Sequence, residues 1–143
     1  MLKLWLAWKH HGDVGFASRI DHAVAMAAHA SARITGSGGE FERVTGNFTN
    51  VIFGWIPPDL RPLDLSTQSI QQLDVVTHER LHSLAPMIKA CMQNAGTAMM
   101  GFQPVAGLNT FRLLFMNPEV QTTDIDAMLD RVAQYGREMT TVA

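Results

Sequence analysis

The sequence has a single cysteine, Cys91, among its 143 residues. One thiol cannot form an internal disulfide, and it excludes any metal site built on several thiolates. So little cysteine suits a protein of a reducing compartment. Lysine is also scarce, since only Lys3, Lys9 and Lys89 are present. Any chemistry that needs a lysine amine must therefore use one of these three residues.

Long apolar runs and an excess of positive charge are missing as well. The net charge is −2, so the composition indicates neither a nucleic-acid partner nor an anionic membrane surface. No apolar run approaches the roughly 20 residues that span a bilayer. The apolar stretch at residues 4–8 is shorter than the core of a signal peptide, which needs about seven or more residues. We therefore expect a cytoplasmic protein that neither binds nucleic acid nor enters a membrane.

Hydrophobic patterning predicts an α+β fold. Helices are expected at residues 2–10, from Asp13 to about 34, from about 72 to 94, and from 122 or 123 to Gly136; strands are expected at 40–44, 50–56, 97–102 and 109–116. Pro86 lies inside the third helix and is expected to kink or break it, and Val76 is expected to face inward. Because short turns separate the strands, we predict an antiparallel sheet with the helices packed on one face.

Arg112 is the first candidate functional residue. It lies in an otherwise apolar strand and shares a face with Thr110 and Leu114, because side chains alternate along a strand. A guanidinium in that place must be paired or must reach water. Its planar group could bind the carboxylate or phosphate of a ligand. The alternatives are an ion pair with a nearby acid and an ordinary solvated face.

The second candidate is the segment from His78 to His82, which reads HERLH. Two histidines four residues apart on a helix could hold zinc, with Glu79 as a general base. Pro86 follows within about a turn, and no third ligand stands in a recognisable context. The alternative is a polar helix face with ordinary histidines, and we predict no metal site.

Other residue types give weaker signals. Two further pairs of histidines, His10 with His11 and His22 with His29, are expected on or beside polar helix faces. Cys91 fits the apolar stripe of its helix and is expected to be a core thiol. The chain contains no P-loop, no GxGxxG and no GxSxG motif.

Six segments carry longer motifs, in the order of the chain. Residues 3–9 read KLWLAWK, residues 49–61 read TNVIFGWIPPDLR, residues 80–89 read RLHSLAPMIK, residues 99–104 read MMGFQP, residues 109–112 read NTFR with Asn117-Pro118 after them, and residues 123–126 read TDID.

Together these segments resemble the C-terminal part of the group II pyridoxal-phosphate (PLP)-dependent amino-acid decarboxylases, in the branch of glutamate decarboxylase and cysteine sulfinate decarboxylase. The resemblance implies the small C-terminal domain of a fold-type I PLP enzyme. Residues 37–143 would form this domain, and residues 1–36 would be helices that join it to a missing large domain. It also implies that Arg112 binds the substrate carboxylate that leaves as CO₂.

The family's PLP-bearing lysine follows a histidine, whereas the three lysines of this chain follow Leu, Trp and Ile. The resemblance therefore implies that this chain contributes no catalytic and no cofactor-binding residue, and that a large domain binds PLP. Three departures from the family pattern affect packing: Gly54 stands in place of Trp, Thr110 in place of Phe, and Phe102 in place of Tyr.

We therefore expect a fragment of a decarboxylase for a small acidic amino acid such as glutamate, cysteine sulfinate or aspartate. The parent enzyme is expected to be a homodimer, and the fragment is expected to be inactive alone. A fragment should also expose an apolar patch around Leu4, Trp5 and Trp8. The alternatives are a non-catalytic interaction module and a zinc hydrolase that uses His78, Glu79 and His82.

Overall fold

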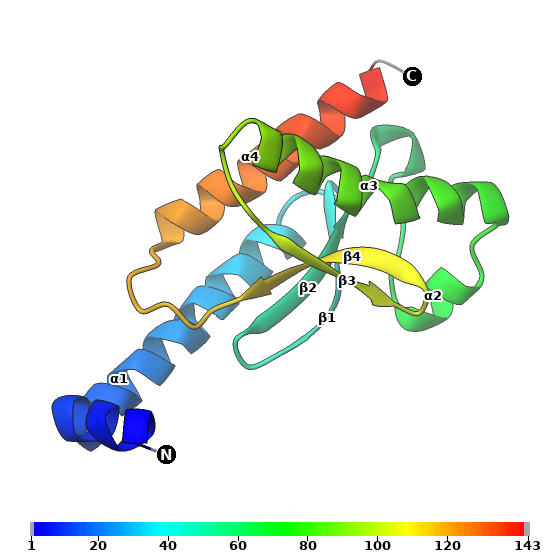
Figure 1. The fold of residues 1–143 in the computed structure, drawn as a ribbon. Coiled ribbons are helices and arrows are strands. Elements are labelled where there is room, and N and C mark those ends of the chain that lie inside the picture. Colours follow the sequence, from blue (N-terminus) through cyan, green and yellow to red (C-terminus); the bar gives the residue numbers. More distant parts are fainter. Residues whose placement is uncertain (1, 142–143) are drawn as a thin grey trace.

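The computed structural model describes residues 2–141. In chain order the elements are α1 (Leu2–Thr35), β1 (Phe41–Asn47), β2 (Asn50–Trp55), the 3-10 turn η1 (Pro58–Leu60), α2 (Thr67–Gln71), α3 (Val75–Asn94), β3 (Gly101–Val105), β4 (Leu108–Leu114) and α4 (Thr122–Thr141). Figure 1 shows a sheet crossed by the long helices, with the start of α1 reaching away from the body.

The sheet is antiparallel, with the strand order β1-β2-β4-β3. Phe53 of β2 lies directly opposite Phe111 of β4, and their rings stack with 5.4 Å between centroids. Both rings are buried in one core with Ile34 of α1, Ile88 of α3 and Leu129 of α4. The antiparallel sheet with its helical layer confirms the predicted α+β fold.

Helix α1 consists of two helical pieces that meet at Gly12. The φ angle of Gly12 is +64°, a conformation that favours glycine because other residues carry a Cβ. The indole Nε1 of Trp8 donates to Asp13 Oδ1 at 2.7 Å, and the Trp8 ring stacks on Phe16. These contacts hold the first piece at a defined angle.

Among residues 2–141, no helix has both the length and the apolar character that crossing a membrane requires.

Helix α3 starts three residues later than expected, at Val75. The carboxylate of Asp74 accepts the backbone N–H of Thr77 at 3.0 Å and so caps the helix. This start places Val76 in the exposed first turn, so the prediction that Val76 faces inward is wrong. The connection between β2 and α3 contains the short helix α2 with Ser66 as its N-cap.

The expected break at Pro86 is also wrong, because α3 continues through it to Asn94. A proline has no N–H to donate to the carbonyl four residues earlier, which here belongs to His82. The side-chain Nδ2 of Asn109 in β4 donates to that carbonyl at 3.1 Å instead. A tertiary hydrogen bond therefore satisfies the acceptor that Pro86 leaves free.

Strand β3 begins four residues and ends three residues later than predicted, and it includes Pro104. β3 is an edge strand, where a residue without an N–H is tolerated. The turn between β3 and β4 consists of Ala106 and Gly107, both with positive φ.

Helix α4 does not end at Gly136, as predicted, but continues to Thr141. A Cβ at Gly136 would lie 2.6 Å from atoms of the Trp55 ring. The glycine therefore permits the close approach of an indole rather than terminating the helix. The indole Nε1 of Trp55 donates to Glu40 Oε1 at 3.4 Å, and the same oxygen accepts Arg137 Nη1 at 2.6 Å.

The first prediction concerns the bond between Asn109 and α3. We expect Asn109→Ala to destabilise the protein by about 1–3 kcal/mol, because the His82 carbonyl loses its donor. In a Pro86→Ala background, whose helix supplies its own N–H, the loss should be clearly smaller. Denaturant unfolding of both single variants and the double variant measures this coupling. Equal losses in both backgrounds would show that Asn109 does not compensate for the proline.

Segment 56–74 connects β2 to α3 and contains three aspartates with lowered pKa values. Hydrogen bonds from Arg80 lower the pKa of Asp59. Hydrogen bonds from Ser69 and Ser66 lower that of Asp64, and the contact with Thr77 lowers that of Asp74.

The second prediction follows from these shifts. A carboxylate with a lowered folded-state pKa contributes stability above its unfolded value, about 4, and that stability is lost as the pH falls through the folded pKa. We expect segment 56–74 to loosen before the sheet does, below about pH 4. Amide hydrogen exchange at pH 3 and pH 6 measures the order. Faster exchange in the sheet than in this segment at pH 3 would contradict the prediction.

Candidate functional site

Arg112 lies in the middle of β4, opposite Ile52 of β2 and Gly101 of β3. Its neighbour Phe111 points into the helical core, where it is 1% exposed. Since side chains alternate along a strand, Arg112 points to the opposite face of the sheet, and its side chain is exposed. The sheet therefore presents this guanidinium on the side away from the main helical layer.

The guanidinium has one hydrogen-bond partner in the described part of the chain. Its Nε donates to Oδ1 of Asn50 at 3.2 Å. Among residues 2–141, no aspartate or glutamate forms an ion pair with it. The internal ion pair that the sequence left open is therefore not formed. Both terminal nitrogens remain without a protein acceptor in this part of the chain and can bind a carboxylate through two parallel hydrogen bonds.

Exposed apolar side chains stand on the chain after Arg112 and on the hairpin before Asn50. Leu114, two residues further along β4, is 42% exposed, and Met116 beyond it is 75% exposed. Phe48, at the tip of the hairpin between β1 and β2, is 80% exposed. A partner that covered these side chains would remove water from the guanidinium and strengthen its attraction for an anion.

His82 of the HERLH segment contacts Asn109 of β4. His82 Nδ1 accepts the backbone N–H of Asn109 at 3.3 Å, and its Nε2 lies 3.1 Å from Asn109 Nδ2. The rings of His78 and His82 stack with 5.8 Å between centroids, and Glu79 is exposed. No group of three or more potential metal ligands occurs within residues 2–141. Both ring nitrogens of His82 thus face β4 and are not available to a metal.

The other candidate residues, which are the histidines of α1 and Cys91, are not brought next to Arg112. His22 contacts the carbonyl of Val120, and His29 contacts Asp126, so both link α1 to the α4 end of the chain. Cys91 is only half-buried, less than expected for a core thiol.

The lysines offer no place for PLP near the guanidinium. Lys89 Nζ lies 5.3 Å from the ring centroid of Phe102. Phe102 is paired with Phe111, so this contact is on the helical side of the sheet. Lys9 lies over Trp5 at the start of α1. The described residues thus do not fit a PLP site on their own.

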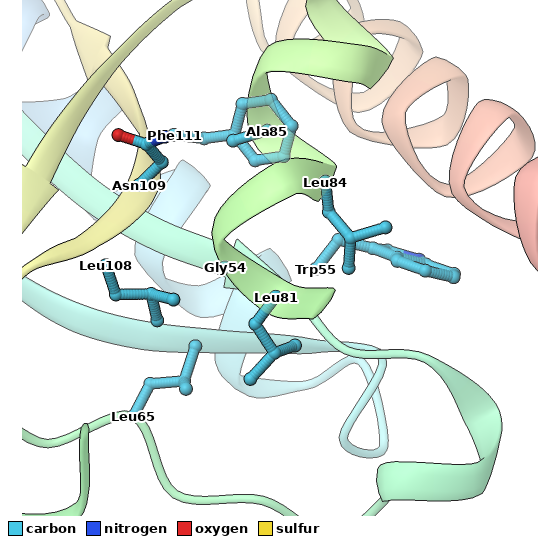
Figure 2. Close-up of a pocket in the computed structure, with 9 residues that line it drawn as sticks. All are labelled: Gly54, Trp55, Leu65, Leu81, Leu84, Ala85, Leu108, Asn109 and Phe111. Carbon is cyan, nitrogen blue, oxygen red and sulfur yellow. The ribbon is translucent and has the colours of Figure 1, made fainter. Parts of the chain in front are cut away.

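A small cavity between α3 and the sheet cannot hold a ligand. Figure 2 shows its lining, which includes Leu65, Leu81, Leu108 and Phe111. Its volume is about 10 Å³, which is no more than a single water requires. Leu65 occupies the space above Gly54, where a Cβ would overlap Leu65 Cδ1. This contact accounts for glycine at a position where the family pattern has a large Trp.

Sequence reasoning missed the roles of two asparagines, one that contacts Arg112 and one that contacts α3. Asn50 and Asn109 both stand in the quoted motifs, TNV and NTFR, but no role followed from the motifs alone. Strand register is the signal that was missing, because it brings Asn50 close to Arg112 and Asn109 next to α3.

Comparison with known proteins finds homologues of the chain. No protein-family model matches it. Acidic amino acid decarboxylase GADL1 from Bos taurus is 32% identical over 138 residues, which are 96% of this chain and 25% of that protein. The protein of the same name from Mus musculus is 33% identical over 138 residues, 96% of this chain and 24% of its own length. The chain thus spans about a quarter of the length of these relatives.

Solved structures agree with this homology. Mouse CSAD in its apo form matches with a TM-score of 0.79 and 36% identity over 94% of this chain and 27% of that one. Catharanthus roseus tryptophan decarboxylase matches in fold, with a TM-score of 0.70 and 22% identity over 96% of this chain and 26% of that one. The chain is therefore homologous to the C-terminal portion of the group II PLP-dependent amino-acid decarboxylases.

Proposed function

We propose that this chain is the C-terminal part of a PLP-dependent decarboxylase for a small acidic amino acid, and that Arg112 binds the substrate carboxylate. Glutamate, cysteine sulfinate and aspartate are the candidate substrates. One observation carries the proposal: the Arg112 side chain is exposed on the sheet face opposite Phe111, with both terminal nitrogens unpaired within residues 2–141. The name of the GADL1 relatives supports the acidic substrate class.

The chain's role in this reaction is to bind and orient. The open Nη pair would hold the carboxylate in one plane, which removes the orientational freedom of the reacting group. PLP, when bound by a large domain, supplies the electron sink that makes loss of CO₂ possible. The apolar side chains around Arg112 would exclude water once that domain covers them.

In this proposal residues 37–143 form the small domain and residues 1–36 connect it to the large one. The parent enzyme is a cytoplasmic homodimer, and this chain alone does not decarboxylate amino acids. Genomic or transcript sequence upstream of Met1 tests the arrangement. An in-frame extension that encodes a PLP-binding domain with a His-Lys pair would support it, and a stop codon directly upstream would favour an interaction module.

The third prediction concerns Arg112 in a protein that joins this chain to a complete PLP-binding domain. We expect Arg112→Lys to lower kcat/KM about tenfold to a hundredfold, because lysine cannot form the two parallel hydrogen bonds. Arg131→Lys, an equivalent change at an exposed position of α4, should leave the kinetics unchanged. Steady-state kinetics with L-glutamate, L-aspartate and cysteine sulfinate measure both variants. Unchanged turnover of Arg112→Lys with all three substrates would remove the anchoring role.

The fourth prediction concerns the apolar patch on the first piece of α1, formed by Leu2, Leu4, Trp5 and Trp8. Leu4 is 59% and Trp5 57% exposed, as expected of a surface that another domain covers. We expect Trp5→Ser in the isolated chain to reduce self-association and to change Tm by less than about 2 °C, since exposed side chains contribute little to stability.

Ile34→Ala, in the same helix but fully buried, is the matched control and should lower Tm strongly. Sedimentation velocity and thermal unfolding measure both properties. A large fall in Tm for Trp5→Ser would show that the patch belongs to the core of this chain.

A further inference from the structure

Asn50 and Arg112 are diagonal neighbours on one face of the sheet. Asn50 lies opposite Leu114 and Ile52 lies opposite Arg112 in the pairing of β2 with β4. Residues two apart on a strand share a face, so the side chains of Asn50 and Arg112 point to the same side. The backbone pairing of Asn50 with Asn47 across the β1–β2 hairpin holds the asparagine at the start of β2.

In the contact between them, Arg112 uses only its Nε–H group. Arg112 Nε donates to Asn50 Oδ1 at 3.2 Å, and the two terminal nitrogens have no acceptor within residues 2–141. A guanidinium is planar, so fixing Nε restricts the plane in which the terminal N–H groups lie. An arginine restrained in this way loses less side-chain freedom when a carboxylate binds.

We propose that Asn50 is a positioning residue that sets the plane of the Arg112 guanidinium for the substrate carboxylate. The inference rests on the proposed function of Arg112. An asparagine suits this task because its amide oxygen accepts the Nε–H without carrying a negative charge. The full positive charge of Arg112 thus remains available to an anion.

An aspartate at the same position would have the opposite effect. Its carboxylate would form an ion pair with Arg112, compete for the terminal nitrogens and repel the substrate carboxylate. Asn50→Asp should therefore weaken carboxylate binding more than Asn50→Ala, although the two side chains of Asn and Asp have nearly the same shape. A purely structural role for Asn50 would give the reverse order, because aspartate preserves the hydrogen bond.

NMR spectroscopy of the ¹⁵N-labelled 143-residue chain tests the proposal. The Nε–H signal of Arg112 is assigned by its loss in Arg112→Lys, and its proton exchange rate and its shift on titration with L-glutamate are measured. We expect Asn50→Ala to accelerate Nε–H exchange severalfold and to raise the Kd for L-glutamate about fivefold, as loss of one ordinary hydrogen bond does. Asn50→Asp should raise the Kd further.

Asn47→Asp is the matched control, because it adds the same charge to the same hairpin without contacting Arg112. It should leave the Nε–H exchange rate unchanged and affect the Kd less than Asn50→Asp does. Thermal unfolding confirms that each variant folds, and Asn50→Leu, which has a similar size but no acceptor, replaces Asn50→Ala if the latter unfolds.

The outcomes separate the two claims. If L-glutamate shifts the Arg112 signal and Asn50→Ala leaves both Kd and exchange rate unchanged, the positioning role is overturned while the anchoring role stands. If L-glutamate does not shift the Arg112 signal in the unsubstituted chain, the anchoring role fails for this chain. In that case slower or unchanged Nε–H exchange in Asn50→Ala overturns the positioning role as well, and faster exchange supports the restraint of the guanidinium.

Discussion

The antiparallel pairing of β2 with β4 is the constraint on which the rest of the structure depends. It places Phe53 against Phe111 on the helical side and, because side chains alternate, Arg112 on the opposite side. A shift of the register by one residue would bury the guanidinium and expose the phenylalanine. The aromatic stack that stabilises the core therefore also determines where the cation is presented.

Two asparagine side chains of β2 and β4 add hydrogen bonds that the strand pairing itself does not provide. Asn109 serves as the external donor that lets α3 continue through Pro86, and it also holds His82. Asn50 restrains Arg112 on the other face of the sheet. Strand β4 thus contributes an asparagine that supports α3, and β2 contributes one that contacts Arg112. Both asparagines stand in the motifs shared with the decarboxylases.

Periodicity predicted the α+β class, the four strands and the long helices, because alternation and a 3.6-residue repeat report which face is buried. The errors fall where tertiary contacts override a local rule. Pro86 does not break α3 because a distant side chain replaces its missing N–H, and Gly136 does not end α4 because it makes room for Trp55. Arg112 could be identified from its apolar strand, whereas its partner Asn50 depends on a register that single-sequence patterns do not contain.

In the proposed function, an adjoining domain would cover two surfaces: the exposed surface at Arg112 and Leu114, and the apolar patch at the start of α1. A crystal structure of the complete enzyme with a bound, unreactive amino-acid analogue tests the central claim most directly. The account predicts that a carboxylate of the analogue contacts both terminal nitrogens of Arg112 while Nε stays on Asn50. A carboxylate bound elsewhere, with Arg112 facing solvent, would contradict it.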